Sequence, residues 1–281
     1  MAKKSTIPVS APAAIVVFAT LASVVYTFPV VRHLTTAIPY TFGVPADWSL
    51  ENLVPGDHLQ FYYALSLTAE MARGEAPWFQ DPYQFSAPEP PKRSSFFFLP
   101  FSLLFAAMAA PLGGPAAYNL LLLSSFPATA LSVFLLARRL GLDWGGAAVS
   151  ATAVTLLPYR IASLAAGHPI GLSFFLLPLA LYFLERAWQD ASRAAAAAGG
   201  FTLVVLAVNE PHLLYFFAFL LPLWLVFAAW RIEPRRRAAD LSPSLVPLAL
   251  AAAGPAIVWA FQEARQGAVW RVDSGLLLWL A

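Results

Sequence analysis

Three short polar segments interrupt an otherwise apolar sequence, and each contains side chains that could do chemistry. The first segment contains Asp57 and Gln60, the second contains Arg160 and His168, and the third contains Glu210 and His212. Carboxylates and imidazoles can move protons or hold a metal ion. An arginine can bind phosphate oxygens with two parallel hydrogen bonds. These segments are therefore the candidates for a site that handles an anionic substrate.

Each segment also has a plain structural interpretation. Asp57 follows Pro-Gly at the start of an expected helix, where it can cap free N–H groups. Arg160 and His168 can reach lipid headgroups from positions at the membrane surface. Glu210 and His212 can form a tight turn exposed to water, although ionisable residues at membrane level are usually functional. The residue types alone leave both interpretations open.

The composition decides the class of protein. Of 281 residues, 59% are hydrophobic and only 11% are charged, and the mean hydropathy is +0.67. Soluble domains contain roughly 25% charged residues, and disordered chains are polar. Cysteine is absent, which excludes disulfides and thiolate zinc sites, and the basic residues are too scattered for a nucleic-acid interface. The sequence therefore predicts an all-α polytopic membrane protein.

Apolar runs of spanning or nearly spanning length predict about seven membrane spans. They cover residues 11–31, 116–137, 145–157, 170–184, 194–208, 213–230 and 245–261. The loop from 32 to 95 is long. Within it, Leu59, Tyr63, Leu67 and Met71 recur every four residues, which predicts an amphipathic helix over 57–73 lying on the membrane surface.

The stretch 96–112 is apolar but contains Pro100 and Pro111. If it does not cross the membrane, the basic segments at 138–139, 185–193 and 231–237 all face the cytoplasm with the N-terminus. If it does cross, 138–139 and 231–237 face outside. The charge rule therefore favours an interfacial or re-entrant helix at 96–112, which puts the three candidate segments together on the extracytoplasmic side.

A succession of short motifs resembles a known family. They are Gly56-Asp57-His58-Leu59-Gln60-Phe61-Tyr62, Arg73-Gly74-Glu75-Ala76-Pro77-Trp78, Phe98-Leu99-Pro100-Phe101, Tyr118-Asn119-Leu120, the 136–142 run, Pro158-Tyr159-Arg160 with Gly167-His168, and Leu177-Pro178-Leu179 with Leu184-Glu185-Arg186. In order and spacing over about residues 10–235, the chain resembles the GT-C superfamily of integral-membrane glycosyltransferases. Within that superfamily it is most similar to bacterial YfhO-like and PMT-like (family 39) proteins.

The resemblance implies a GT-C-like helix bundle of the bacterial inner membrane, with a long first extracytoplasmic loop carrying juxtamembrane helices. It implies a catalytic or metal-binding acid at Asp57 and a polyprenyl-phosphate sugar as donor. Relatives often carry an acidic pair in the next outer loop, where this chain has Arg160 and His168. The resemblance therefore leaves open whether the site binds a divalent metal ion. Relatives are longer, so the chain resembles the N-terminal part of such an enzyme.

The function expected from these residues is transfer of a sugar to an acceptor on the extracytoplasmic face. Asp57 and Glu210 are the expected catalytic residues, and Arg160, His168, Gln60 and His212 the expected substrate-binding ones. A transporter or lipid flippase is the alternative, although such proteins hold ionisable residues near the bilayer midplane. The third possibility is a non-catalytic, truncated relative of these enzymes. The expected partners are a lipid-linked donor and membrane lipid, without nucleic acid; the sequence leaves the oligomeric state open.

The topology can be tested with single cysteines, because the native chain contains none. We expect Ser86→Cys to react with a membrane-impermeant thiol reagent in intact cells and Ser242→Cys to react only after the cells are opened. The positive-inside rule is the reason, since it places 32–95 outside and 231–237 inside. The opposite labelling pattern would make 96–112 a true span.

Overall fold

The computed structural model describes residues 10–28, 30–39, 58–78, 98, 100–165, 167–190 and 192–231, and every regular element in them is a helix. In chain order these are α1 (Ser10–Tyr26), η1 (Val30–His33), α2 (His58–Arg73), α3 (Phe101–Leu112), α4 (Gly114–Arg139), α5 (Trp144–Thr155), α6 (Pro158–Ala165), α7 (Pro169–Ser173), α8 (Leu176–Asp190), α9 (Arg193–Asn209) and α10 (Pro211–Arg231). The expected all-α class is confirmed for this part of the chain.

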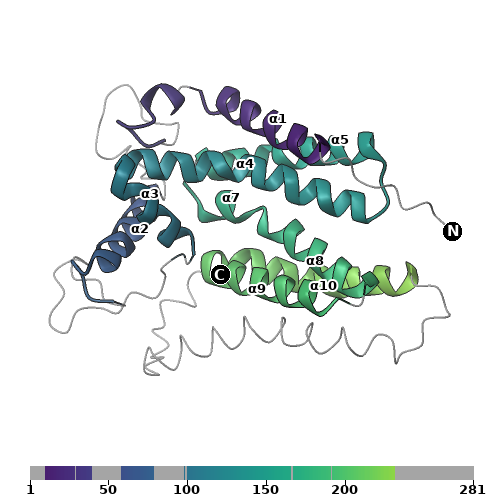
Figure 1. Cartoon of the computed structure of the whole chain (residues 1–281). Helices are drawn as coiled ribbons and strands as arrows, with labels where there is room; N and C mark the ends of the chain where they lie inside the picture. The colour runs from purple at the N-terminus through teal and green to yellow at the C-terminus, as the bar shows by residue number, and fades with distance from the viewer. Residues whose placement is uncertain are drawn as a thin grey trace, which may run out of the picture.

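The longest helix, α4, is the one on which most of the others pack. α1 and α5 pack against it, α8 packs against it from another side, and α9 lies on α8. Figure 1 shows these helices running in roughly the same direction, with α2 and α3 standing at one end and crossing that direction. A continuous core that includes Phe105, Tyr118, Phe126, Leu184 and Leu206 joins the layers.

α8 and α9 contact each other extensively, and α9 presents small residues to its neighbour. Ala195, Ala196 and Gly199 are buried on the inner face of α9. A Cβ atom added to Gly199 would lie 3.3 Å from Leu184 of α8. Small residues let two helix backbones approach, which is the way apolar helices gain contact area in a membrane.

Two helical segments are long and apolar enough to cross a membrane, Gly114–Arg139 and Pro169–Asp190. A third candidate is the broken pair Trp144–Thr155 and Pro158–Leu164, whose two parts are bent by 42°. The length matters because about 20 residues are needed to cross the hydrocarbon core. The chain therefore has two to three helices suited to a membrane among its described residues.

The remaining expected spans fall on shorter apolar helices or outside the described residues. The apolar helices Ala11–Tyr26, Arg193–Asn209 and His212–Trp224 coincide with expected spans. The first of these ends earlier than the expected boundary at residue 31. The Thr27 hydroxyl there bonds back to the Ser23 carbonyl at 2.7 Å, and Pro29 cannot continue a helical hydrogen-bond ladder. The expected span 245–261 lies outside the described residues.

Within the stretch 96–112, residues 101–112 form the short helix α3, which has 12 residues. At 1.5 Å per residue this helix is about 18 Å long, well short of the roughly 30 Å of hydrocarbon in a bilayer. It packs against α2 and the start of α4. A helix of this length does not cross the bilayer by itself, and its interfacial or re-entrant placement stays a prediction.

The predicted apolar row of α2 is buried only in its second half. Leu67 and Met71 are buried, whereas Leu59 and Tyr63, which begin the row, are 58% and 38% exposed. The helix instead buries His58, Phe61 and Leu65 against α3 and α4. Aromatic packing explains the difference: the Phe61 ring meets Phe98 at 4.8 Å and Tyr118 at 5.9 Å, both edge to face. Tertiary contacts therefore bury one face of α2 and leave Leu59 and Tyr63 exposed, and the position of this helix on the membrane surface stays a prediction.

The two ends of the bundle differ in chemistry. At one end, called here the basic end, Arg139 of α4 pairs with Asp190 of α8 at 2.5 Å, and Arg138 lies over Trp144. This ion pair joins the last residues of α4 and α8, so both helices run from the opposite end of the bundle toward the basic end. All four histidines of the chain, His33, His58, His168 and His212, lie next to elements at that opposite end. We call it the histidine end.

Asn119 fastens the segment after η1 to the start of α4. Its buried amide donates to the carbonyls of Leu34 at 2.9 Å and Ala37 at 2.7 Å. We expect Asn119→Ala to lower the free energy of unfolding by about 1–3 kcal/mol, because both carbonyls lose their donor inside the protein.

Thermal unfolding followed by tryptophan fluorescence measures this loss. Ser124→Ala on the same helix is the matched control, because its partly buried hydroxyl only bonds back to Leu121 within α4. Equal midpoints for Asn119→Ala and Ser124→Ala would show that the segment after η1 is not held by this side chain.

Candidate functional site

The histidine end gathers three segments that are far apart in the sequence. They are the start of α2, the turn between α6 and α7, and the junction of α9 and α10. α8 follows α7 directly and α9 returns antiparallel along α8, so the end of α9 lies near the start of α8. α7 also contacts α9. The candidate site is built from side chains on these three segments.

His58, the first residue of α2, is completely buried. Its Nδ1 atom lies 3.2 Å from the hydroxyl of Tyr118 on α4, and the two rings meet edge to face. Tyr62, one turn further along α2, packs on the same Tyr118 ring at 5.6 Å. These contacts fix the start of α2, and therefore the direction in which the chain enters it.

Gly167 brings the turn between α6 and α7 against His58. Its φ angle of +72° is in the left-handed region that favours glycine. A Cβ atom at this position would lie 2.5 Å from both the backbone nitrogen and the ring of His58. Only a glycine therefore allows this approach, which joins the Gly167-His168 turn to the start of α2.

Glu210 and His212 form a pair at the junction of α9 and α10. Glu210 is 6% exposed, and its Oε1 atom lies 2.8 Å from Nδ1 of His212. The same oxygen accepts a bond from the His212 backbone N–H at 3.3 Å. The His212 side chain is 82% exposed. A carboxylate that accepts from Nδ1–H leaves Nε2 as a proton acceptor directed at the surroundings.

Arg160 lies inside the bundle, whereas the sequence placed it in a short outer loop. It is on the first turn of α6 and is completely buried. It donates to the carbonyl of Thr155 at 2.9 Å and the hydroxyl of Ser125 at 2.7 Å, and its guanidinium lies 4.4 Å from the centre of the Phe126 ring. The guanidinium therefore does not face the surface of the histidine end.

The other candidates are placed as follows. His168 is exposed on the Gly167-His168 turn, where its backbone N–H donates to Ser163 at 2.9 Å. Gln60 is exposed on α2. Asp57 lies outside the described residues, so the structure places only its neighbour His58. His58 and Gly167-His168 are thus brought together, Glu210 pairs with His212 at the same end, and Arg160 is separated from the surface they form.

His58 and Tyr118 are the residues that sequence reasoning missed as parts of this site. Both occur in the motifs that carry the family resemblance, but neither was assigned a role. For His58, the signal was the spacing of aromatic and apolar residues in α2, where 58, 61, 62 and 65 share one face of a helix. That spacing predicts a face packed against another element.

Outside this cluster, the charged side chain of Glu75 pairs with a neighbour in the sequence. At the end of α2, Arg73 donates to the Glu75 carboxylate at 2.7 and 2.9 Å, and these bonds hold the pKa of Glu75 below its usual range. Both side chains are about half exposed. Within the described ranges, no group of three histidine or acidic side chains is arranged to hold a metal ion.

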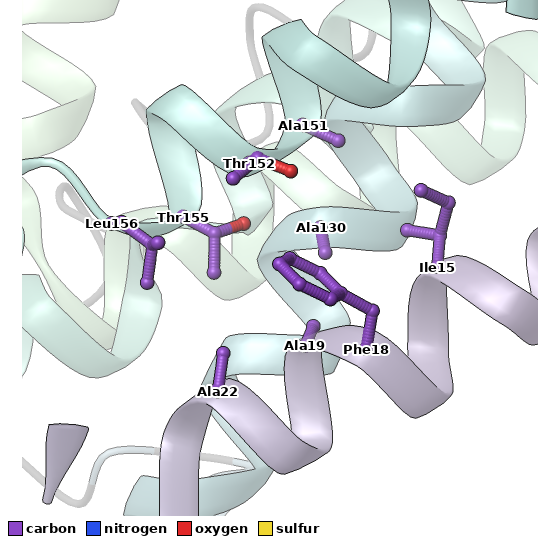
Figure 2. Close-up of a pocket in the computed structure, with 9 residues that line it drawn as sticks. All are labelled: Ile15, Phe18, Ala19, Ala22, Ala130, Ala151, Thr152, Thr155 and Leu156. Atoms are coloured by element: carbon purple, nitrogen blue, oxygen red, sulfur yellow. The ribbon is translucent and has the colours of Figure 1, made fainter. Parts of the chain in front are cut away.

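A separate recess lies between α1, α4 and α5, and Figure 2 shows the side chains that line it. They are Ile15, Phe18, Ala19, Ala22, Ala130, Ala151, Thr152, Thr155 and Leu156. The recess is too small to hold a water molecule, and only its two threonines are polar. None of the candidate site residues lines it.

Comparison with known proteins gives no independent assignment. No family model matches the chain, and no curated protein or solved structure matches it. The function must therefore be argued from the geometry of the residues themselves.

The contact between Gly167 and His58 predicts a specific loss of stability. We expect Gly167→Ala to lower the free energy of unfolding by more than the roughly 1–3 kcal/mol that a left-handed backbone costs a residue with a Cβ atom, because the methyl group also displaces His58. Thermal unfolding in detergent, followed by tryptophan fluorescence, is the measurement.

Gly74→Ala is the matched control for this prediction. Gly74 has a similar φ of +77°, but nothing lies within 4 Å of its added Cβ. The difference between the two losses in the free energy of unfolding measures the contribution of the close approach to His58. If both variants lose the same stability, the turn does not pack against the start of α2 in the protein.

Proposed function

We propose that the chain acts at a membrane as a glycosyltransferase, or as the N-terminal part of one, that moves a sugar from a polyprenyl-phosphate donor to an acceptor hydroxyl. The observation that carries the proposal is the gathering of proton-transferring groups at the histidine end of an apolar helix bundle. The Glu210–His212 pair lies at the same end as the start of α2, next to which the resemblance places the catalytic Asp57.

The pair is suited to proton transfer. Glu210 is buried and bonded to Nδ1 and N of His212, so it fixes the orientation of the ring while Nε2 stays directed outward. A base held in one orientation within reach of a hydroxyl is what activation of that hydroxyl requires. In the reaction, the acceptor hydroxyl gives its proton to the base, its oxygen bonds to the anomeric carbon, and the bond to the lipid phosphate breaks.

The roles divide among the candidates accordingly. Asp57 and His212 are the two bases that this end can offer, and Glu210 orients His212. His168 faces the lipid phosphate, because the burial of Arg160 keeps its guanidinium from the surface. Gln60, exposed on the first turn of α2, contacts the sugar or the acceptor. A divalent metal ion is not required by this arrangement.

A transporter is the second candidate, and one observation favours it. Arg160 is buried inside the bundle at the bend between α5 and α6, and broken helices with internal charges are typical of transporters. Incubating the purified chain with a labelled polyprenyl-phosphate sugar separates the two. Release of polyprenyl phosphate supports the transferase, and an unchanged donor across a range of acceptors refutes it.

Two substitutions distinguish the bases. We expect Asp57→Asn and Glu210→Gln each to slow donor consumption by about 10²- to 10⁴-fold, the range that a positioned base contributes. Asparagine caps a helix about as well as aspartate, so the first change tests the charge rather than the cap. The rate of polyprenyl-phosphate release is the measurement.

Arg186→Gln is the control for both variants, since Arg186 is half exposed at the basic end, where it lies 3.8 Å from Asp190. It should leave the rate unchanged. A normal rate for Asp57→Asn with a slow rate for Glu210→Gln would make His212 the base and Asp57 a cap. Normal rates for both would refute the proposed site.

A further inference from the structure

The bend between α5 and α6 contains a buried positive charge that no other charge of the described residues balances. α5 ends at Thr155, α6 begins at Pro158, and the two helices are bent by 42°. Arg160 follows within the first turn of α6 and is 0% exposed. An arginine stays protonated in proteins, so its charge must be balanced where it lies.

The partners of Arg160 are all neutral. They are the Thr155 carbonyl, the Ser125 hydroxyl and the face of the Phe126 ring. The Ser125 hydroxyl in turn donates to the Leu122 carbonyl at 2.6 Å, so it gives the guanidinium no charge. Such contacts satisfy some N–H groups, but they do not replace the counter-charge that a buried ion requires.

No carboxylate of the described residues contacts Arg160. Glu75 pairs with Arg73, Asp190 with Arg139, and Glu210 with His212. The Nε–H group of Arg160 has no acceptor in this part of the structure, and the buried Thr155 hydroxyl oxygen has no partner either. Thr155 and Arg160 lie at the same bend, because the Thr155 carbonyl accepts a hydrogen bond from the Arg160 guanidinium. Two hydrogen-bond donors without acceptors beside an unbalanced positive charge are the chemistry of an anion site.

The depth of the site excludes a lipid headgroup as its ligand. Ser125, which Arg160 touches, is 11 residues from the first residue of α4 and 14 from its last. These distances correspond to about 16 and 21 Å along the helix, so if α4 spans the bilayer, Arg160 lies near the middle of the hydrocarbon. Thr155 also lines the recess between α1, α4 and α5, which has no room for a water molecule in this structure, so a ligand at the bend requires this recess to widen and must be small. One unbalanced positive charge calls for one negative charge.

We propose that the bend between α5 and α6 binds a small monovalent anion on the guanidinium of Arg160. Nε–H and the Thr155 hydroxyl donate to the anion, and the positive end of the α6 helix dipole adds to the attraction. The site is independent of glycosyl transfer at the histidine end. Chloride is the probe, because it is monovalent, small and abundant.

The test uses the full chain purified in detergent, with sodium gluconate replaced stepwise by sodium chloride at constant ionic strength. Ligand binding to the folded state raises the midpoint of thermal unfolding. We expect a saturable rise of about 2–4 °C in chloride. Arg160→Gln should abolish the rise, and Arg160→Lys should shift it to several-fold higher chloride, because lysine keeps the charge but loses the Nε–H donor.

Two further variants keep the test decisive. Arg186→Gln removes an exposed arginine at the basic end and should keep the full rise. If Arg160→Gln does not fold, Thr155→Ala removes only one proposed donor and should raise the chloride concentration at half-saturation several-fold. Identical midpoints of the unsubstituted chain in chloride and gluconate would overturn the proposal. So would a rise that persists undiminished in Arg160→Gln or, where that variant does not fold, in Thr155→Ala.

Discussion

The fold depends on one constraint: polar groups inside an apolar helix bundle must find their hydrogen-bond partners within the protein. The hydroxyls of α4 show how this is met. Ser124, Ser125, Thr129 and Ser132 each donate to a carbonyl three or four residues earlier in the same helix. The helix therefore carries polar residues through the core without breaking. Where this local solution fails, as at Arg160, the chain brings together residues from several elements, and those places are the candidates for function.

The sequence was sufficient to locate the helices and insufficient to orient them. Apolar runs at 116–137, 194–208 and 213–230 correspond closely to α4, α9 and α10, because helix formation and length depend on local composition. The face of α2 could not be predicted in the same way. Leu59 and His58 are adjacent and both compatible with burial, and only the aromatic partners on α3 and α4, distant in sequence, decide in favour of His58.

The candidate site was predictable in its residue types and only partly in its geometry. Charge asymmetry placed His168, Glu210 and His212 at one end, and the antiparallel return of α9 along α8 follows from a short connection between them. The burial of Arg160 could not be predicted. A basic residue shortly after a proline is typical of a surface loop, and only the contact with Ser125 on α4 shows that this one is inside the bundle. The contact of His58 with the turn between α6 and α7 could not be predicted either. It depends on Gly167, more than 100 residues later, which can approach His58 only because it has no side chain.

The two kinds of polar site place different demands on the same bundle. At the histidine end, His168 and His212 are exposed, and the contact with Glu210 fixes the orientation of His212. At the bend, Arg160 is permanently charged and shielded, so its position depends on what neutralises it. α6 connects the two, since it begins at the bend and is followed by the Gly167-His168 turn against His58. A helix of only 8 residues therefore carries the buried arginine near its start and leads into the turn at its end, so about two turns of helix separate a shielded charge from an exposed histidine.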